Sequence, residues 1–500
     1  MSIDVPCPRG AQIPADGGSW RIRIRRAAGV TVLGCMLFLA SCDERPLSSP
    51  QPAGGVHTQS VIAGPFTFEN FALGAIPGTV CPGSSACTNG AAEPAIRADN
   101  TGTFYVSSEL GLGGGTLAWK STDGGLHYTA LESPNQISQV LGGVGPGGGD
   151  TDLSTAPQAN ASGIHNLYVA SLTLANVTVS TSQDGGTTWT KNVISATIPG
   201  DDREWIAADQ ATKVCISYHD AVTFNIDVNC SFDAGATFTQ VGSAIDVAHA
   251  FLVDDNAIGN LTIDPNSHVV YQAFSGIAST TEALLPSSYH AVWIAVSRDG
   301  GQTFTDNPVY VNPNSSVSYG HQFVNVSVDR AGTVYVVYTD NHNLFYSFST
   351  DGGQTWTGPI QVNQAPSATA IMPWSVACNP GQLNIVWYGT SFYDGTTAPD
   401  NYPASAAWYV FFAQSVNAAA PGSTFTQAAA TPIIHYGGVC ESGVGCTGNR
   451  DLYDDFGIAV SPTTGLASIV YSDDQPGNVG RDDHTAIATQ TAGPKICAAP

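Results

Sequence analysis

The chain has 500 residues, of which only 11% are charged, and its 16 basic and 40 acidic side chains give a formal net charge of −24 at pH 7. Such an acidic protein repels nucleic acid and anionic lipid, so the charge argues against a nucleic-acid partner. The 54 glycines and the low charged fraction are typical of an all-β protein with many turns.

Residues 1–41 are predicted to be an export signal. Basic residues 21–26 precede an apolar run at residues 27–40, which is shorter than the roughly 20 residues that a transmembrane helix needs. The run ends in Leu39-Ala40-Ser41-Cys42, which resembles the lipobox of bacterial lipoproteins. That resemblance implies lipidation of Cys42 and a membrane-anchored protein on the periplasmic or extracellular face of the cell envelope. An ordinary secretory signal with a chance cysteine is the alternative.

Residues 42–60 are rich in Pro, Ser, Gln and Gly and are expected to form a flexible tether. Removal of residues 1–41 takes away five arginines and two aspartates, which leaves a mature chain with a net charge of −27. We expect this mature chain to be a monomer.

Eight cysteines follow Cys42, and an even number in an exported chain predicts disulfides. Eight cysteines allow many pairings, so the sequence alone does not select one. A zinc site is the competing interpretation, but the short cysteine pairs lack the two-to-four-residue gap of a zinc knuckle. The pairing that local spacing favours joins Cys81 with Cys87, Cys215 with Cys230, Cys440 with Cys446 and, by elimination, Cys378 with Cys497.

From residue 61 onward, short alternating runs bounded by Gly, Asn, Asp and Pro predict strands and no long helix. Residues 201–245 contain four such strands in succession. A four-stranded unit can be traced seven times, by second strands at residues 103–106, 166–170, 213–219, 268–272, 333–338, 383–387 and 466–471. The last unit lacks a fourth strand, which an N-terminal strand near Val61–Phe68 would supply. Ring closure removes sheet edges, so residues 61–500 predict one all-β domain, a β-propeller of seven four-stranded antiparallel blades, with six blades as the alternative.

One motif recurs in five units: Ser, Asp two residues later, Gly four later, Thr or His six later and an aromatic residue seven later. The copies are 49 to 66 residues apart, a period typical of propellers or solenoids. We place the motif in the hairpin between the third and fourth strands, where Asp and Ser hydrogen-bond within the turn and the aromatic ring is buried between sheets. A sixth copy survives only as its right half, Gly422–Phe425. The five aspartates are predicted to be structural and are Asp123, Asp184, Asp233, Asp299 and Asp351.

The five copies resemble the Asp-box, or BNR repeat, of the sialidase-like superfamily, and the resemblance covers roughly residues 90–490. It implies a β-propeller with Asp-boxes at the periphery, away from the active-site mouth. The superfamily includes exo-sialidases, other glycoside hydrolases and non-catalytic binding propellers, so the fold does not fix the function.

A sialidase-type site needs arginines that clamp the substrate carboxylate, a tyrosine nucleophile activated by a carboxylate, and an acid/base carboxylate. The family's Arg-Ile-Pro signature is absent from the first unit, and a salt bridge to neighbouring acids is the plain interpretation of each arginine. The candidates near the innermost strands are Arg97, Arg203 and Arg450 for the clamp, Tyr453 with Glu204 for the nucleophile, and Asp152 or Asp150 for the acid/base.

Many acidic residues are also predicted to converge on the funnel. Close carboxylates raise one another's pKa or recruit a cation, so Ca²⁺ is the one cofactor considered, with no ligand residue assigned to it. Two of the acids could instead act as acid and base on a neutral polysaccharide, with Trp205 and Trp374 stacking on sugar rings. A solvated acidic rim is the remaining alternative. These acids are Glu93, Asp201, Asp202, Asp254, Asp255, Asp451, Asp454 and Asp455.

The sequence therefore predicts an exported cell-surface propeller that engages a glycan, with a sialidase-like (exo-α-sialidase type) glycoside hydrolase as the leading activity. The alternative is a non-catalytic propeller that binds a protein or a polysaccharide in the cell envelope. The two hypotheses differ in whether three arginines meet in the funnel.

Overall fold

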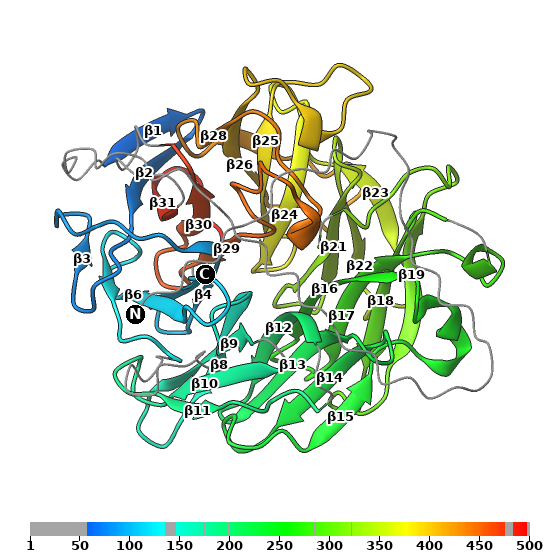
Figure 1. Ribbon diagram of the computed structural model, residues 1–500, viewed down its shortest axis with the longest axis horizontal. Helices are drawn as coiled ribbons and strands as arrows, with labels where there is room; N and C mark the ends of the chain where they lie inside the picture. Colours follow the sequence, from blue (N-terminus) through cyan, green and yellow to red (C-terminus); the bar gives the residue numbers. More distant parts are fainter. Residues whose placement is uncertain are drawn as a thin grey trace, which may run out of the picture. The chain divides into compact units, whose positions relative to one another are not determined.

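Seven antiparallel sheets make up the part of the chain that the structure describes (Figure 1). This computed structural model describes residues 58–135, 147–173, 176–197, 201–284, 287–321, 323–475 and 484–497, which belong to the unit Gln51–Pro500. The predicted export signal and Cys42 lie outside the described residues. No helix among the described residues is long and apolar enough to cross a bilayer.

The first three blades each contain four consecutive strands, as the repeated unit predicts. Blade 1 contains β4 (Ala92–Ala98), β5 (Phe104–Glu109), β6 (Thr116–Ser121) and β7 (Tyr128–Ala130), with β3 (Val80–Cys81) outside β7. Blade 2 contains β8 (Thr151–Ala159), β9 (His165–Leu172), β10 (Val177–Ser182) and β11 (Thr190–Asn192). Blade 3 contains β12 (Asp201–Asp209), β13 (Lys213–Asp220), β14 (Ile226–Ser231) and β15 (Gln240–Ser243).

The next three blades repeat the pattern, with short 3₁₀ helices in some connections. Blade 4 contains β16 (Asn256–Ile263), β17 (Val270–Gly276), β18 (Ala291–Ser297) and β19 (Thr305–Val311), with η2 (Val247–Leu252) before it and η3 (Glu282–Leu284) within it. Blade 5 contains β20 (Asn325–Val328), β21 (Val334–Thr339), β22 (Leu344–Ser349) and β23 (Thr357–Gln361). Blade 6 contains β24 (Thr369–Ala377), β25 (Leu383–Thr390), β26 (Ala407–Ser415) and β27 (Thr426–Ala429), with η4 (Pro399–Asn401) within it and β28 (His435–Tyr436) paired to β26.

The seventh blade is built from both ends of the described chain, as predicted. It contains β29 (Gly457–Val460), β30 (Ala467–Asp473) and β31 (His484–Ala492), preceded by η5 (Gly443–Gly445). β2 (Phe66–Ala72) pairs with β31 as the fourth strand, and β1 (Gln59–Ala63) adds a fifth outside it. The closing strand therefore begins five residues later than the predicted Val61, because the hairpin of β1 and β2 occupies the predicted position. The pairing of β31 with β2 therefore joins the two ends of the described chain within the last blade.

The innermost strand of each blade contacts the innermost strand of the next, and β29 contacts β4, which confirms the closed ring of seven. Because the strands of a blade are antiparallel, the starts of the first and third strands lie at one face. We call this face the mouth. The turns between third and fourth strands lie at the opposite face, which we call the turn face.

The five predicted motifs form equivalent hydrogen-bonded turns between the third and fourth strands. In each, the Ser Oγ donates to the Asp Oδ1 at 2.7–2.8 Å and accepts from the Gly N–H at 2.8–2.9 Å. The same Asp Oδ1 accepts the backbone N–H four residues later at 2.8–3.0 Å. The aspartates therefore close the turns, as expected of a structural role.

The aromatic residues of these turns are less uniform than predicted. Tyr128 and Phe304 are buried, whereas Trp189, Phe238 and Trp356 are half-buried at the blade edges. Each half-buried ring still packs against a cluster of buried apolar side chains.

The sixth turn is more complete than its sequence suggests. Ser415 Oγ donates to Asn417 Oδ1 at 3.0 Å, and Asn417 Oδ1 accepts the Thr424 N–H at 3.2 Å. Asn thus takes the place of Asp, and three extra residues separate it from Thr, which hid the left half of the motif.

All four favoured disulfide pairings are confirmed. Cys215–Cys230 joins neighbouring strands β13 and β14, with a Cα–Cα distance of 4.1 Å. Cys378–Cys497 fixes the C-terminal segment to the end of β24. The other two, Cys81–Cys87 and Cys440–Cys446, close short loops.

Candidate functional site

Two charged side chains enter the mouth from bulges in the innermost strands. The register of β4 shifts between Ala92 and Ala95, and that of β12 shifts between Asp202 and Glu204. Glu93 and Arg203, at these bulges, adopt left-handed φ values of 48° and 45°. Such bulges redirect a side chain, and left-handed non-glycine residues are strained and concentrate at functional sites.

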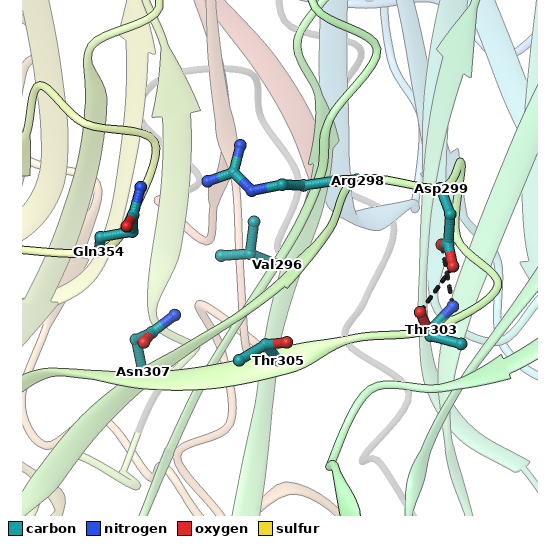
Figure 2. A pocket seen from close by; sticks show the side chains of 7 residues that line it. All are labelled: Val296, Arg298, Asp299, Thr303, Thr305, Asn307 and Gln354. Carbon is teal, nitrogen blue, oxygen red and sulfur yellow. Dashed lines mark hydrogen bonds between the residues drawn. The ribbon is translucent and has the colours of Figure 1, made fainter.

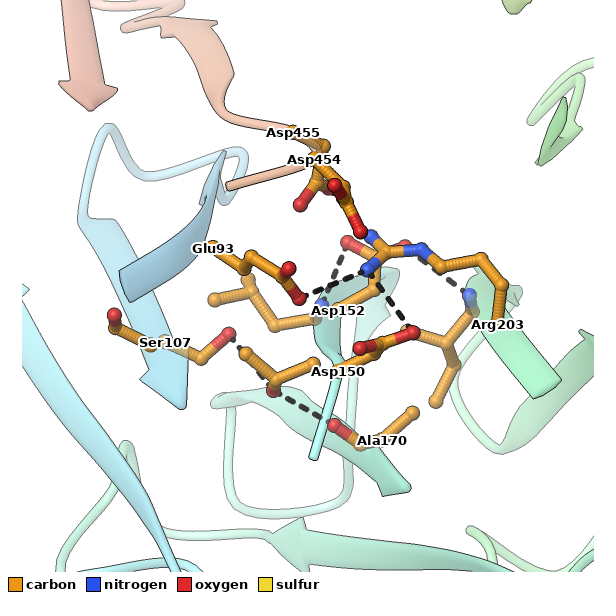
Figure 3. A network of polar contacts seen from close by, with 12 residues as sticks. Glu93, Ser107, Asp150, Asp152, Ala170, Arg203, Asp454 and Asp455 are labelled. Atoms are coloured by element: carbon orange, nitrogen blue, oxygen red, sulfur yellow. Dashed lines mark hydrogen bonds and ion pairs between the residues drawn. The ribbon is translucent and has the colours of Figure 1, made fainter. Parts of the chain in front are cut away.

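Arg203 is the centre of a polar cluster at the mouth (Figure 3). Its Nη2 donates to Asp455 Oδ2 at 2.5 Å, while its Nη1 lies 3.6 Å from Asp150 Oδ2 and 3.7 Å from Glu93 Oε2. The residue is only 4% exposed. One buried guanidinium thus faces three carboxyl groups from three other blades. Its single positive charge cannot neutralise all three of them when they are ionised.

Arg450 approaches the same cluster from the loop before β29. Its Nη2 donates to Glu93 Oε1 at 3.0 Å and to Asp454 Oδ2 at 2.6 Å. Glu93 therefore contacts both Arg203 and Arg450, two of the three arginines predicted to clamp a substrate carboxylate. The side chains of Arg450, Asp150 and Asp454 are 29%, 21% and 19% exposed, so these three are accessible to a ligand.

The third predicted clamp arginine belongs to a different contact. Arg97 Nη2 donates to Asp152 Oδ1 at 2.9 Å, and its guanidinium lies 5.3 Å from the centre of the Trp374 ring. Asp152 also accepts the N–H groups of Leu153 and Ile206 and is buried. Asp152 is thus buried and accepts three hydrogen bonds from within the fold, so it is poorly placed to exchange a proton with a ligand. The half-exposed Asp150 is therefore the better acid/base candidate.

The two tryptophans predicted to stack on sugars form the floor of the mouth instead. Trp205 is 0% exposed and Trp374 is 5% exposed, and their ring centres are 5.1 Å apart. Phe323 completes the layer, 5.3 Å from Trp205, and the Arg203 guanidinium lies 4.0 Å above the Trp205 ring. Trp205 is thus covered by Arg203, and Trp374 is buried beside it with the Arg97 guanidinium over its ring, so neither ring is exposed to a ligand in the mouth.

The predicted nucleophile pair is not formed. Glu204 is fully buried, and neither of its carboxylate oxygens has a hydrogen-bond partner, so Tyr453 does not donate to it. Tyr453 adopts a left-handed φ of 57°, with the Arg450 guanidinium 5.4 Å from its ring centre. The local backbone therefore directs Tyr453 toward Arg450 and leaves Glu204 below the cluster.

Burial and mutual repulsion raise the pKa of several carboxyl groups at the mouth. Desolvation and the charge of Asp150 raise the pKa of Glu93 and of Glu204 well above its ordinary value. Desolvation raises the pKa of Asp455 to about 7, although Arg203 opposes the shift and Asp150 adds to it. The cluster therefore holds protons near neutral pH, which is a property required of a general acid.

Glu109 is a site residue that the sequence analysis missed. It is the last residue of β5, and its Oε2 accepts the N–H of Gly111. Desolvation raises the pKa of Glu109 to about 7, against the opposing effect of the Gly111 N–H, with the charges of Asp150 and Asp454 adding to the rise. The second strand of each blade ends at the mouth. An acidic residue just after a predicted second strand was therefore the sequence signal that could have identified Glu109.

The remaining predicted acids divide between the cluster and other places. Asp202 is close enough to Asp150 for the charge of Asp150 to contribute, after desolvation, to its raised pKa. Asp451 instead lies within 4.8 Å of His435 and Asp474. Asp254 and Asp255 lie in the connection that precedes β16, and the side chain of Asp201 is outside the described residues.

The closest groups of potential metal ligands do not support calcium binding at the funnel. Among the described residues, two sets of three potential metal ligands have ligand atoms within 4.8 Å of one another, and neither set includes a carboxylate that contacts Arg203. The two sets are Asp246, His249 and Asp306, and His435, Asp451 and Asp474.

Three hollows among the described residues lie away from the mouth, one of them, of about 490 Å³, beside Asp264 and Arg330. One of about 280 Å³ lies on the other side of the aromatic floor, among the later residues of all seven innermost strands, and includes Arg97 and Trp374. Another of about 470 Å³ lies beside β18 and β19, with Arg298 and Asp299 at its edge (Figure 2). Asp299 turns back to accept hydrogen bonds from Thr303, so this aspartate is used by its own turn.

No protein-family model matches the chain, and no curated protein matches it. Among solved structures, it is similar to a protein of unknown function from Dyadobacter fermentans, with 12% identity and a TM-score of 0.44 over 88% of this chain and 99% of that chain. It is also similar to an α-L-arabinanase of Penicillium chrysogenum, with 11% identity and a TM-score of 0.43 over 86% and 98% of the two chains. A mutant of the NanB sialidase of Streptococcus pneumoniae shows 12% identity and a TM-score of 0.39 over 85% and 70%. At this distance the similarities assign neither a function nor a site residue.

Proposed function

We propose that the mouth binds an uncharged glycan and hydrolyses its glycosidic bonds with carboxyl groups, Glu109 acting as the general acid. The observation that carries the proposal is a group of carboxyl side chains at the mouth, of which Asp150 and Asp454 are 21% and 19% exposed. Burial of Glu109, with the charges of Asp150 and Asp454, raises its pKa to about 7, which supports the role of proton donor. Glycoside hydrolysis requires one carboxyl group that donates a proton to the leaving oxygen and a second that acts as base or nucleophile.

An uncharged substrate fits the mouth better than a sialoside. Arg203 and Arg450 already donate to carboxylates, and Arg97 is paired with Asp152 elsewhere. An incoming carboxylate would have to displace these partners inside a chain whose mature form has a net charge of −27. A sialidase-like activity therefore stands as the second candidate activity, favoured by the position of Arg203 and Arg450 around one point, Glu93.

The proposal is tested by assaying the purified protein on 4-methylumbelliferyl glycosides and neutral polysaccharides, with a fluorogenic sialoside in the same panel. Glu109→Gln is expected to lower kcat by at least about 100-fold while leaving KM within a few-fold, because it removes a proton donor and keeps the shape. The alkaline limb of the kcat profile, expected near pH 7, should disappear in this variant. Glu132→Gln, at an exposed glutamate that follows the last strand of blade 1, is the control and should retain activity.

The panel also separates the alternatives. Cleavage of the sialoside that Arg450→Ala removes would identify a sialidase-like site. Saturable binding of a polysaccharide or protein with no cleavage of any substrate would replace the enzyme by a non-catalytic binding propeller.

We also propose that the protein is exported and anchored to the cell envelope through lipid on Cys42. The four disulfides support an oxidising compartment. Labelling with radioactive palmitate in a bacterial host tests the anchor: label is expected on the wild-type protein and absent from Cys42→Ala.

A further inference from the structure

Two carboxylates and an imidazole meet where the connection between blades 3 and 4 packs against the outermost strand of blade 4. Asp246 precedes η2 as its N-cap, His249 lies within η2, and Asp306 is the second residue of β19. Each of the three offers an oxygen or nitrogen atom, and these atoms lie within 4.8 Å of one another. The trio is separate from the mouth and has no part in the proposed hydrolysis.

The backbone holds both carboxylates in place. Asp246 N–H donates to Asp306 Oδ2 at 2.8 Å, and Asp306 N–H donates to Asp246 Oδ2 at 3.0 Å. Asp246 Oδ1 accepts from the backbone N–H and from Nδ1 of His249, both at 2.9 Å. The imidazole is therefore fixed beside two anchored carboxylates, and His249 Nδ1 lies 3.8 Å from Asp306 Oδ2.

A second, independent observation points to a ligand. Asp306 is only 3% exposed, and its Oδ1 has no hydrogen-bond partner. A buried carboxylate oxygen without a partner is strongly unfavourable, more so beside a second carboxylate. A bound cation would remove both penalties, because it neutralises the pair and supplies the missing partner.

We propose that Asp246, His249 and Asp306 bind a divalent transition-metal ion of the Zn²⁺ or Mn²⁺ type. Ligand bonds of about 2.0–2.2 Å place tetrahedral ligand atoms roughly 3.4 Å apart, and the observed separations of 2.9 Å and 3.8 Å from His249 Nδ1 lie on either side of that value. An imidazole among carboxylates favours such ions over Ca²⁺ or Mg²⁺, which prefer oxygen ligands. On binding, the ring's one proton sits on Nε2 and the Nδ1 lone pair goes to the metal, so that the ligand is a neutral imidazole.

The other convergent trio provides a contrast within the same protein. In that trio both His435 nitrogens are engaged, Nδ1 with Asp474 Oδ2 at 2.6 Å and Nε2 with the Gly438 carbonyl at 3.1 Å. Its imidazole thus donates to an acceptor from each nitrogen, whereas the hydrogen bond described for the His249 ring is made by Nδ1, so His249 can carry its proton on Nε2 while Nδ1 binds a metal. Asp474→Asn is therefore a matched control for Asp306→Asn.

The test is isothermal titration of Zn²⁺, and separately Mn²⁺, into the purified full-length protein after chelator treatment. Affinity tags are removed and free thiols are blocked with iodoacetamide, because histidine tags and thiolates bind zinc. We expect one site per chain, and we expect Asp306→Asn and His249→Gln each to weaken binding by at least about tenfold, while Asp474→Asn changes it by less than about twofold. Circular dichroism confirms folding of each variant, and His249→Gln, at a half-exposed position, decides the matter if Asp306→Asn does not fold.

Two outcomes would overturn the assignment. One is the absence of a one-to-one site for either ion in the wild-type protein. The other is a site whose affinity survives His249→Gln, or falls only in Asp474→Asn, which would place the metal elsewhere.

Discussion

Replacement of Arg203 by methionine should destabilise the protein strongly and in a pH-dependent way. The guanidinium is 4% exposed and lies within 2.5 to 3.7 Å of Asp455, Asp150 and Glu93. Its removal leaves these carboxylates without their shared cation, and removing one partner of a buried ion pair costs about 3–5 kcal/mol. At pH 5 the loss should be smaller, because the pKa of Asp455, about 7 in the native protein, keeps that group protonated there.

The measurement is urea unfolding at pH 5 and pH 8, followed by tryptophan fluorescence. Arg330→Met is the matched control: Arg330 is exposed and donates to Asn379, so its loss should change the unfolding free energy by no more than about 0.5 kcal/mol. A loss below about 1 kcal/mol for Arg203→Met at pH 8, or an equal loss at both pH values, would refute the view that this guanidinium compensates the buried acids.

Three further predictions concern the fold. Burial raises the pKa of Asp455 from 3.8 to about 7, so the native state binds its proton more tightly than the unfolded state does. This group should therefore lower the unfolding free energy as the pH rises from about 4 to 7. The difference in urea midpoint between wild type and Asp455→Asn across that pH range measures the effect. Ser349→Ala should cost about 1–3 kcal/mol in urea unfolding because it leaves the buried Gly353 N–H without an acceptor, whereas Ser316→Ala on an exposed loop should have little effect. Loss of the Cys378–Cys497 disulfide, which spans 119 residues, should destabilise by about 5 kcal/mol, against about 2 kcal/mol for either disulfide that spans six, and an equal effect of all three would contradict the loop-entropy argument.

The sequence was sufficient for the architecture because the architecture rests on local, repeated signals. The turn motif recurs in five of the seven units, strand residues alternate with a period of two, and each cysteine has a plausible partner nearby or by elimination. The sequence also predicted the strand that completes the last unit. That unit lacks a fourth strand of its own, and a strand near residue 61 was available to pair with it. The β1–β2 hairpin displaced that partner by a few residues, which pattern alone does not resolve.

The site was harder to predict because it depends on side-chain directions and on pairing between distant blades. The bulge at Arg203 carries no glycine or proline that would have indicated it, whereas Pro94, directly after Glu93, was a local signal for the other bulge. Both Arg97 and Arg203 were predicted on or just before innermost strands, but Arg97 lies near the end of β4 and pairs with Asp152, whereas Arg203 lies near the start of β12 and enters the mouth. The burial of Trp205 beneath Arg203 is likewise a consequence of how seven strands meet at one axis.

The environments of the turn aspartates and of the mouth aspartates shift the carboxyl pKa in opposite directions, as Asp299 and Asp455 show. At the turn face, Asp299 accepts hydrogen bonds from Ser297, Gln302 and Thr303, which outweigh desolvation and lower its pKa to about 2. At the mouth, desolvation and like charges raise the pKa of Asp455 to about 7, even though it contacts an arginine. A carboxylate stabilised by several donors is suited to closing a turn, whereas one whose proton is held near neutral pH is suited to exchanging it.

That contrast argues for function at the mouth independently of any resemblance. Left-handed strain at Glu93, Arg203 and Tyr453, and buried polar atoms without partners on Arg203, Glu204 and Asp455, gather at one face of the ring. Each feature is unfavourable for folding by itself, and a polar ligand would relieve part of the unsatisfied hydrogen bonding. A fold that closes its turns with such regular hydrogen bonds tolerates this concentration of strain and charge where binding or catalysis depends on it.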